Sequence, residues 1–405
     1  MRIEDKMIIE LCKKEVNYST VHSIANQADF NIDYFFNIID KHMITAVVLS
    51  KILKLKALSL FKKRIYVHAK KSVLETTFQN QLIKNELLRT QSILNKHNIE
   101  SILIKGLSLD FSGLRKLGDL DILVHQKDLL DAIEALKEID YYYVGNIMDA
   151  LLSSDEKKDI KLQLNWNNQF QLHNKETGIL LELHTNLFQR DRAYRIKLDG
   201  LWDNIDIFWD NKIWSDSLNS YIFSNENLLI LICMHNAIKR SLSSNRFVLR
   251  SLIDIENLIE RGVDWNEIIE TSTKCKIMPF IFFSLSQARY ILDAEIEDSL
   301  LEDLKVNCSG SELFLEELHS RCFQSLEASS VFFSNVYKIL STFVYKSTLS
   351  NKIKNILLMH ILFPSKYRMS SIYTISQRSP LIYFTYLINP LRWIYLIIKS
   401  LFRKR

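Results

Sequence analysis

Apolar residues recur at helical spacing along most of the chain, and this spacing changes only in one middle segment. From the start to about Asn98, apolar positions fall three or four residues apart, as on one face of an amphipathic helix. The same spacing returns beyond about Ser224 and continues to about Ser350, most clearly over Leu228 to Ile238 and Phe247 to Ile259. The pattern therefore predicts helical regions on both sides of the middle segment.

The middle segment predicts a small α/β unit between about Ser101 and His184. An amphipathic helix within it carries Leu129, Leu130, Ile133 and Leu136. Short apolar runs predict strands over Ser101 to Ile104, Asp119 to Val124, Tyr141 to Val144, Lys161 to Trp166 and Gly178 to His184. We place this unit at 96–215, with an N-terminal helical region over 1–95, a C-terminal helical domain over 216–350 and a hydrophobic-aromatic tail over 351–405.

The composition is that of a folded protein. A chain of 405 residues can form two or three domains. Hydrophobic residues make up 47% and charged residues 24%, which argues against disorder as the dominant state. The net charge of +5 is too small to indicate nucleic-acid binding by itself, but it suits a polyanionic ligand such as a nucleoside triphosphate.

Cysteine usage and the N-terminus favour a cytoplasmic location. The cysteines are scattered and form no C-x-x-C pair; they are Cys12, Cys233, Cys275, Cys308 and Cys322. We expect buried reduced thiols, not a zinc site or a disulfide framework. Charges interrupt the apolar positions of the first residues at helical spacing, so we expect no signal peptide.

Two aspartates on one predicted strand are the main candidates for chemistry. Asp119 and Asp121 lie two residues apart, so both carboxylates project from the same face of the strand. Leu120, Ile122 and Val124 supply the apolar opposite face. Adjacent carboxylates repel each other unless a cation or proton lies between them, and hard oxygen ligands suit Mg²⁺. The alternative is a solvent-facing turn with two unrelated acids.

The residues upstream of this strand favour a phosphate site. The chain has 8 glycines, and Gly106, Gly113 and Gly118 lie within one short segment. A strand that runs through Lys105 into the Gly106 turn and a short helix exposes backbone N–H groups, which bind phosphate. Lys105 could contact a triphosphate as a point charge, and Arg115 could clamp it with two hydrogen bonds. Alternatively, Lys105 is a solvated strand end and Arg115 a surface residue.

These motifs together resemble a known family. The stretch Ile104-Lys105-Gly106, followed by Arg115-Lys116-Leu117-Gly118-Asp119-Leu120-Asp121-Ile122-Leu123-Val124, resembles the signature of the uncharacterised nucleotidyltransferases of the DNA polymerase β superfamily. The later Gly178-Ile179-Leu180-Leu181-Glu182-Leu183-His184 is similar to the acid-x-His strand of that family. The sequence departs from the family at Glu182, where aspartate is more usual, and at Thr185, where tryptophan often follows. The resemblance covers Leu87 to Phe188 well and extends more loosely to about Glu260.

The resemblance implies both a fold and a reaction. The fold is α+β, a small mixed-sheet core like that of polymerase β with helical regions on both sides. From the resemblance we expect Asp119, Asp121 and Glu182 to be catalytic and to hold two Mg²⁺ ions, with Mn²⁺ as the alternative. The implied reaction transfers a nucleoside monophosphate from a nucleoside triphosphate to a hydroxyl acceptor, which can be a small molecule, glycan, protein or RNA. We expect the pyrophosphate to lie on the Gly106 turn, with Ser108 and Gly118 in the same substrate site.

His184, His235 and Lys239 are further candidates for the substrate site, and Arg250 and Asp254 are candidates for a link to it. His184 shares the strand face of Glu182 and could touch the substrate, or it could be a hydrogen-bonded structural residue. His235 and Lys239 lie four residues apart on one helix face and could line the nucleotide pocket, or be solvated. Arg250 and Asp254 are also one turn apart, which indicates either a local ion pair or a link to the catalytic unit.

The tail leaves two alternatives. From Pro380 onward it is apolar and aromatic, and Arg403-Lys404-Arg405 ends it. Pro390 and Arg392 interrupt it before it is long enough to span a bilayer. It could lie on the inner face of the membrane, as a peripheral contact, or pack on the helical domain.

Two other functions compete with the first. One is a toxin-like nucleotidyltransferase acting on tRNA or protein, although the modest net charge speaks weakly against tRNA. The other is a non-catalytic nucleotide-binding module, against which the intact Asp119, Asp121 and Glu182 argue. The sequence has no Walker loop, no G-x-G-x-x-G and no H-E-x-x-H motif.

Overall fold

A computed structural model defines the fold of most of the chain. It describes residues 1–54, 63–110, 112–144, 160–161, 164, 167–188, 199–242, 249–313, 316–317, 326, 366–373, 375 and 379–402.

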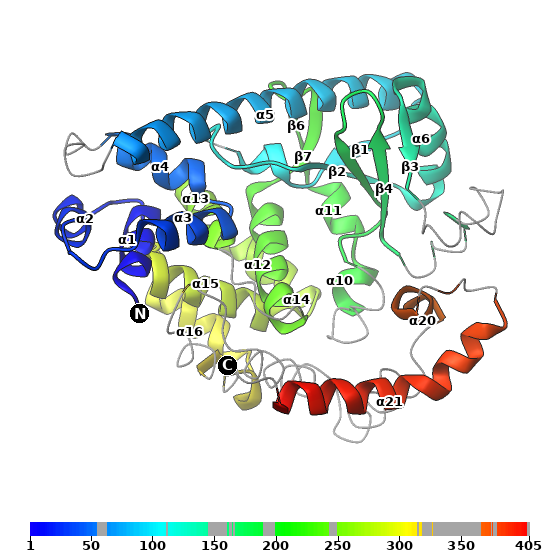
Figure 1. Cartoon of the computed structure of the whole chain (residues 1–405). Coiled ribbons are helices and arrows are strands. Elements are labelled where there is room, and N and C mark those ends of the chain that lie inside the picture. Colours follow the sequence, from blue (N-terminus) through cyan, green and yellow to red (C-terminus); the bar gives the residue numbers. More distant parts are fainter. Residues whose placement is uncertain are drawn as a thin grey trace.

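The structure contains a mixed sheet of seven strands, drawn at the upper right of Figure 1. Its strands are β1 (Ser101–Leu103), β2 (Asp119–Val124), β3 (Tyr141–Tyr143), β4 (Gln169–Asn174), β5 (Leu180–His184), β6 (Lys212–Ser215) and β7 (Ser220–Phe223). Their order is β3-β4-β5-β2-β1-β7-β6. β2 pairs with β5, and β1 with β7, in parallel; the other neighbours are antiparallel.

The alternation of β2 separates two apolar cores. Leu120 and Ile122 pack into a cluster with residues of α5 (Lys63–Lys96) and α6 (Leu129–Leu136). Leu123 points to the opposite face of β2 and belongs to a second cluster, which includes residues of the helices on that side of the sheet. Each leucine or isoleucine buried in this way contributes about 1.5–3 kcal/mol. The sheet is therefore anchored on both faces, and the face of Asp119 and Asp121 looks toward the second cluster.

The N-terminal and C-terminal helices share that second core. The N-terminal helices are α1 (Ile3–Cys12), α2 (Tyr18–Ala25), α3 (Ile32–Lys41) and α4 (Thr45–Lys54). They pack together with α12 (Asn225–Leu242), α13 (Leu249–Glu260), α14 (Trp265–Lys274), α15 (Met278–Leu292) and α16 (Asp298–Val306). The side chains of Asn17, Asn31 and Asp264 cap α2, α3 and α14 by accepting backbone N–H groups. Cys12, Cys233 and Cys275 are buried free thiols, as predicted; Cys308 is free but only partly buried, and Cys322 lies outside the described residues.

Most of the predicted elements are confirmed, and the α+β class with flanking helices is correct. β1, β2, β3, β5 and α6 lie where the pattern indicates. The predicted strand over Lys161 to Trp166 is wrong where it can be compared, because Leu164 donates its N–H to the carbonyl of Ile160 as in a helix. The rest of that range lies largely outside the described residues.

Strands β4, β6 and β7 are not in the prediction. β7 belongs to the sheet although it lies beyond residue 215, where we ended the core. β7 directly precedes α12, so a stretch of sequence centred on β7 contains both strand and helix spacing of apolar residues. The pattern therefore did not indicate this strand. The domain boundaries themselves remain a prediction. Two short helices, α10 (Asp199–Asp203) and α11 (Asp206–Asp210), lie between β5 and β6.

The tail forms the helices α20 (Lys366–Tyr373) and α21 (Leu381–Phe402), the second of which contains Pro390. Figure 1 shows α21 running along one edge of the molecule. Several apolar side chains of α21 are exposed, among them Phe384 at 63% and Leu387 at 73%. Among the described residues, no helix is long and apolar enough to cross a membrane.

Candidate active site

Two neighbouring strands bring the predicted acids to one face of the sheet. β2 and β5 run parallel, and their register pairs Asp121 with Glu182. Residues two apart on a strand share a face, so Asp119 lies on the face of Asp121, and His184 lies on the face of Glu182. Because register partners on adjacent strands project to the same side, three carboxylates and one imidazole gather there.

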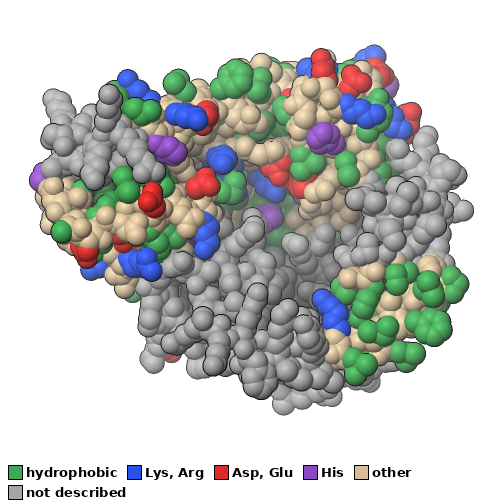
Figure 2. Space-filling view, viewed as in Figure 1, with side chains coloured by type: hydrophobic (Ala, Val, Ile, Leu, Met, Phe, Trp, Pro, Cys, Tyr) green, Lys and Arg blue, Asp and Glu red, His purple; other side chains and the backbone are tan. Residues whose placement is uncertain are grey.

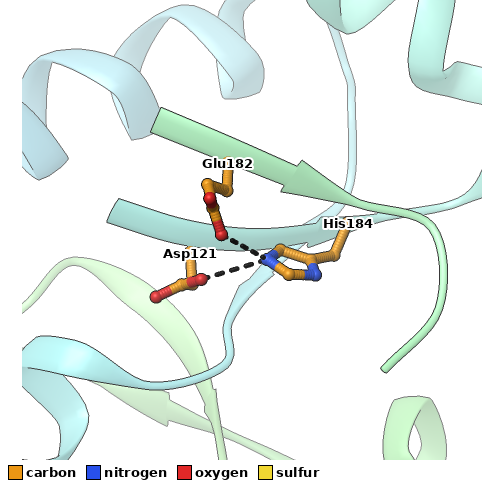
Figure 3. A group of neighbouring side chains, drawn as sticks. All are labelled: Asp121, Glu182 and His184. Carbon is orange, nitrogen blue, oxygen red and sulfur yellow. Dashed lines mark hydrogen bonds and ion pairs between the residues drawn. The ribbon is translucent and has the colours of Figure 1, made fainter. Parts of the chain in front are cut away.

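His184 and Lys105 contact the same oxygen of Asp121. The Nε2 atom of His184 donates to Oδ1 of Asp121 at 3.0 Å, and the Nζ atom of Lys105 lies 2.8 Å from that oxygen. Nε2 of His184 is also 3.6 Å from Oε2 of Glu182 (Figure 3). Gln171 on β4 donates from Nε2 to Oε1 of Glu182 at 2.9 Å. Donors on neighbouring elements thus hold both carboxylates in place.

The cluster is buried, but two of its polar atoms lack a hydrogen-bond partner among the described residues. Asp121 is 1% exposed, His184 4% and Glu182 7%. Among the described residues, Oδ2 of Asp121 and Nδ1 of His184 have no hydrogen-bond partner. A buried polar atom without a partner costs about 1–3 kcal/mol. These two atoms therefore mark the cluster as a place where a ligand would complete the hydrogen bonding.

The charges of the cluster depend on one another. Burial alone would raise the pKa of Asp121, but the Lys105 ammonium and His184 hold that pKa well below its usual range. Burial and the neighbouring Asp121 charge raise the pKa of Asp119. The pKa values of Lys105 and His184 are raised, because contact with Asp121 outweighs the effect of burial. Contact with the carboxylates thus favours the protonated forms of Lys105 and His184, whereas Asp119 adds negative charge and forms no ion pair among the described residues.

The donor set fits a divalent cation. Asp121, Glu182 and His184 each offer a ligand atom, and these atoms lie within 4.8 Å of one another. Carboxylate oxygens suit Mg²⁺ and Mn²⁺, whereas imidazole suits softer ions. The sequence predicted Asp119, Asp121 and Glu182 as ligands. The structure brings Asp121 and Glu182 together and adds His184, while Asp119 lies two residues away on the same face.

The predicted turn after β1 is present. Gly106 has φ +76°, a conformation that residues with a side chain rarely adopt, and it opens a short 3-10 helix over Gly106–Leu109. Ser108 in that helix is buried, and its hydroxyl has no partner among the described residues. Gly118, next to Asp119, is exposed, with open space where a Cβ would lie. Their roles in phosphate binding remain predictions.

Arg115 is neither a surface residue nor free. Its Nε and Nη2 atoms donate to the two carboxylate oxygens of Asp254 on α13 at 3.0 and 3.1 Å. Its backbone N–H donates to Asp110. Arg250 does not form the one-turn pair with Asp254; its Nη1 atom donates to the carbonyl of Lys116 at 3.2 Å. The α13 helix is thereby bound to the segment that leads into β2, and a role of Arg115 in clamping a triphosphate remains a prediction.

The two predicted residues of α12 are only partly placed. The His235 ring is half-buried, 5.2 Å from the ring of Phe188, which follows β5. His235 thus lies near the end of the strand that carries Glu182 and His184. The side chain of Lys239 lies outside the described residues.

Sequence reasoning did not identify Gln171 and Asn80 as site residues. Gln171 holds Glu182, and the alternation of polar and apolar residues along Gln169–Asn174 was a usable signal for that strand. Asn80 on α5 donates from Nδ2 to Asp110 and to the carbonyl of Arg115, at 2.6 and 2.8 Å. No local pattern marks this residue, because its partners lie far along the chain.

Comparison with known proteins gives one match. Residues 28–293 match the model of a family described as uncharacterised nucleotidyltransferase. The matched range contains every candidate residue of the site. No curated protein and no solved structure matches the chain.

Proposed function

The chain belongs to the uncharacterised nucleotidyltransferase family, and on that premise we propose that it transfers a nucleoside monophosphate from a nucleoside triphosphate to a hydroxyl acceptor. The observation that carries the proposal is the in-register pair Asp121 and Glu182 on adjacent parallel strands, with Lys105 in contact. Phosphoryl transfer needs positioning and neutralisation of charge more than covalent chemistry. A preorganised group of carboxylates with one adjacent lysine supports both.

We propose Asp119, Asp121 and Glu182 as the residues that hold two Mg²⁺ ions, or Mn²⁺. Bound ions of this kind neutralise phosphate charge and orient the reacting oxygens. Glu182 is kept in place by Gln171, so it can assist in removing the proton of an incoming hydroxyl. His184 suits hard divalent ions less well than the carboxylates do. Its hydrogen bond to Asp121 supports a role in orienting that carboxylate.

Lys105 and the Gly106 turn form the proposed phosphate side of the site. The Lys105 side chain is 23% exposed, so its ammonium can be reached from solvent while it contacts Asp121. The positive φ of Gly106 turns the backbone at the end of β1, beside the carbonyl of Asp119. We propose that this turn and Lys105 bind the β- and γ-phosphates, with Ser108 and Gly118 beside them, and that His235 and Lys239 line the nucleotide pocket.

A labelling experiment tests the reaction. The protein is incubated with each nucleoside triphosphate labelled in the α-phosphate, with Mg²⁺ or Mn²⁺ and a cell lysate, and the labelled product is identified. Label in a small molecule or glycan supports the proposal as stated. Label in tRNA or protein favours the toxin-like alternative. Binding of triphosphate without release of pyrophosphate favours a non-catalytic nucleotide-binding module, and absence of both contradicts the proposal.

We also propose a peripheral membrane contact through α21. Leu381, Phe384, Leu387, Ile388 and Leu391 are exposed at helical spacing, which favours binding at a membrane interface. Flotation with anionic liposomes, with and without residues 380–405, is the test. Binding that needs the tail and weakens with salt supports the contact. Failure of the full-length protein to float contradicts it.

A further inference from the structure

A cavity of about 500 Å³ lies next to the residues that lead into β2. Its walls are the end of α3, the start of α4, one face of α5 and the residues just before β2. Small-molecule sites in proteins have volumes of about 300–1,000 Å³. The cavity is therefore large enough for a small molecule, and neither the family description nor the proposed reaction accounts for it.

One face of α5 supplies most of the polar side chains of the cavity. The residues that line it from α5 include His68, Lys71, Ser72, Thr76, Gln79 and Asn80, all polar and spaced as one face of a helix. Further along the same helix, the buried positions include the apolar Ile83, Leu87 and Leu94 as well as the polar Thr90 and Gln91. The face of α5 over the sheet is thus mixed, whereas every residue that α5 contributes to the cavity is polar.

The floor of the cavity connects to the catalytic segment. Thr76 and Asn80 are buried there, at 8% and 6% exposure. Asn80 donates from Nδ2 to the carbonyl of Arg115, but its Oδ1 atom is buried and has no partner among the described residues. The wall also includes Leu117. Leu117 precedes Asp119 by two residues, so their Cα atoms lie at most about 7 Å apart.

The charges around the cavity balance. Lys116 lies 3.8 Å from Asp40, and Lys71 lies 3.7 Å from Glu75; both distances join the ammonium to a carboxylate oxygen. Figure 2 shows that basic and acidic side chains lie next to one another on the face that carries the central hollow. RNA and other polyanions need a predominantly positive groove. A ligand for this cavity is therefore neutral and makes hydrogen bonds as both donor and acceptor.

We propose that this cavity binds the acceptor substrate, and that the acceptor is a neutral polyhydroxylated small molecule of the sugar or cyclitol class. The hydroxyl, amide, imidazole and paired charged groups match hydroxyls on one ligand, and the apolar surface between them, to which Ala46 and Leu117 contribute, suits the C–H groups of its ring. The position of Leu117 brings one end of such a ligand to the start of β2. This inference rests on the proposed nucleotidyl transfer, whose acceptor it names by class.

Binding is measured first, because it does not depend on transfer. Full-length protein is mixed with a set of neutral sugars and cyclitols at about 10 mM, enough to detect millimolar affinity by saturation-transfer NMR. Among the members of the set, at least one is expected to bind. Ser72→Leu should abolish its signal by filling the cavity. Thr77→Leu is the matched control, because Thr77 is exposed on the same helix and does not line the cavity.

Transfer is measured second, with the sugar or cyclitol that binds. Gln79→Ala, at an exposed position that leaves the fold unchanged, should raise the KM for the acceptor about tenfold and leave the KM for the triphosphate unchanged. A change in both KM values, or in neither, overturns the assignment of the cavity to the acceptor.

The two proposals fail differently. If no neutral polyol binds, or if binding survives Ser72→Leu in a folded protein, the cavity inference is wrong even where nucleotidyl transfer to another acceptor is found. If a polyol binds and Ser72→Leu abolishes binding, but no triphosphate is consumed, the cavity inference stands and the proposed transfer fails. Label found only in RNA or protein also overturns the polyol acceptor.

Discussion

Two buried aspartates, Asp121 on β2 and Asp254 on α13, differ in how completely they are neutralised. Both oxygens of Asp254 accept hydrogen bonds from one guanidinium, that of Arg115. In Asp121, Lys105 and His184 share one oxygen, and the other has no partner among the described residues. Asp254 thus forms a complete ion pair with Arg115, which joins α13 to the segment before β2. Asp121 still has one carboxylate oxygen that can bind a ligand.

The two aspartates differ in what their charge is expected to do: that of Asp254 stabilises the fold, and that of Asp121 binds a ligand. A buried pair with every oxygen satisfied stabilises one arrangement of α13 against the segment before β2. In the cluster around Asp121, carboxylates outnumber the cations that contact them. Repulsion between these carboxylates destabilises the cluster unless a further cation binds. Substitutions at the two places should therefore have opposite signatures, one in activity and the other in stability.

The largest effect is expected from Asp119→Asn. Transfer should fall at least about a thousandfold, or about 4 kcal/mol in transition-state stabilisation, because a proposed metal ligand is lost. The melting temperature without metal should stay the same or rise, since repulsion between Asp119 and Asp121 is relieved. Activity and melting are measured on the same preparation. Asp131→Asn, at an exposed position on α6, is the control and should change neither quantity. Activity of Asp119→Asn near the wild-type value would contradict the carboxylate mechanism.

Arg115→Ala should give the opposite signature. It leaves Asp254 buried without its cation, which costs about 3–5 kcal/mol of the free energy of unfolding. Urea unfolding measures this loss, and the double variant with Asp254→Ala should recover part of it. The exposed pair Arg289 and Asp298 is the control, because Arg289→Ala there should change stability little. A stable Arg115→Ala protein that has lost only triphosphate affinity would instead make Arg115 a phosphate clamp.

Lys105→Ala tests whether Lys105, which contacts Asp121, also binds the triphosphate. Triphosphate affinity should fall by about 2 kcal/mol, as a charge-assisted contact to phosphate is lost. Calorimetry with a non-hydrolysable triphosphate and Mg²⁺ measures it, with Lys127→Ala on the surface as control. Unchanged affinity would limit Lys105 to neutralising Asp121.

The smallest effect concerns Glu256, a third buried acid, two residues beyond Asp254. Burial raises its pKa to about 7, although it accepts the backbone N–H of Lys14 and lies near Lys51; Glu260 adds like charge. Because the folded pKa exceeds the unfolded value, this carboxyl stabilises the fold at low pH. That contribution is lost as pH rises through 7, by about 1 kcal/mol between pH 6 and pH 8. Glu256→Gln should remove this pH dependence from urea unfolding. Parallel stability curves for the two proteins would show that Glu256 ionises normally.

The sequence predicted the strand of Asp119 and Asp121 better than the residues that hold this strand in place. Asp119 and Asp121 could be found because strand alternation is local, and Glu182 because a family resemblance identified its strand. The bond between Arg115 and Asp254 could not be found in this way, since it joins residues far apart in the chain and each lies in an unremarkable local pattern. The same holds for Asn80 and the segment it binds. The polar face of α5 is visible in the sequence, but it indicates a cavity only when α3 and α4 are placed opposite it.

The parallel pairing of β1 with β7 has a consequence for biosynthesis. Ile102 lies beside Tyr221, so β1 cannot pair with this neighbour until the ribosome has made the chain well past Glu182, the last of the proposed metal ligands. Such distant pairings form slowly, and an unpaired strand edge attracts other chains meanwhile. We therefore expect nascent chains that stop before Phe223 to depend on chaperones, and a protein released as a whole to refold with less aggregation than its N-terminal half.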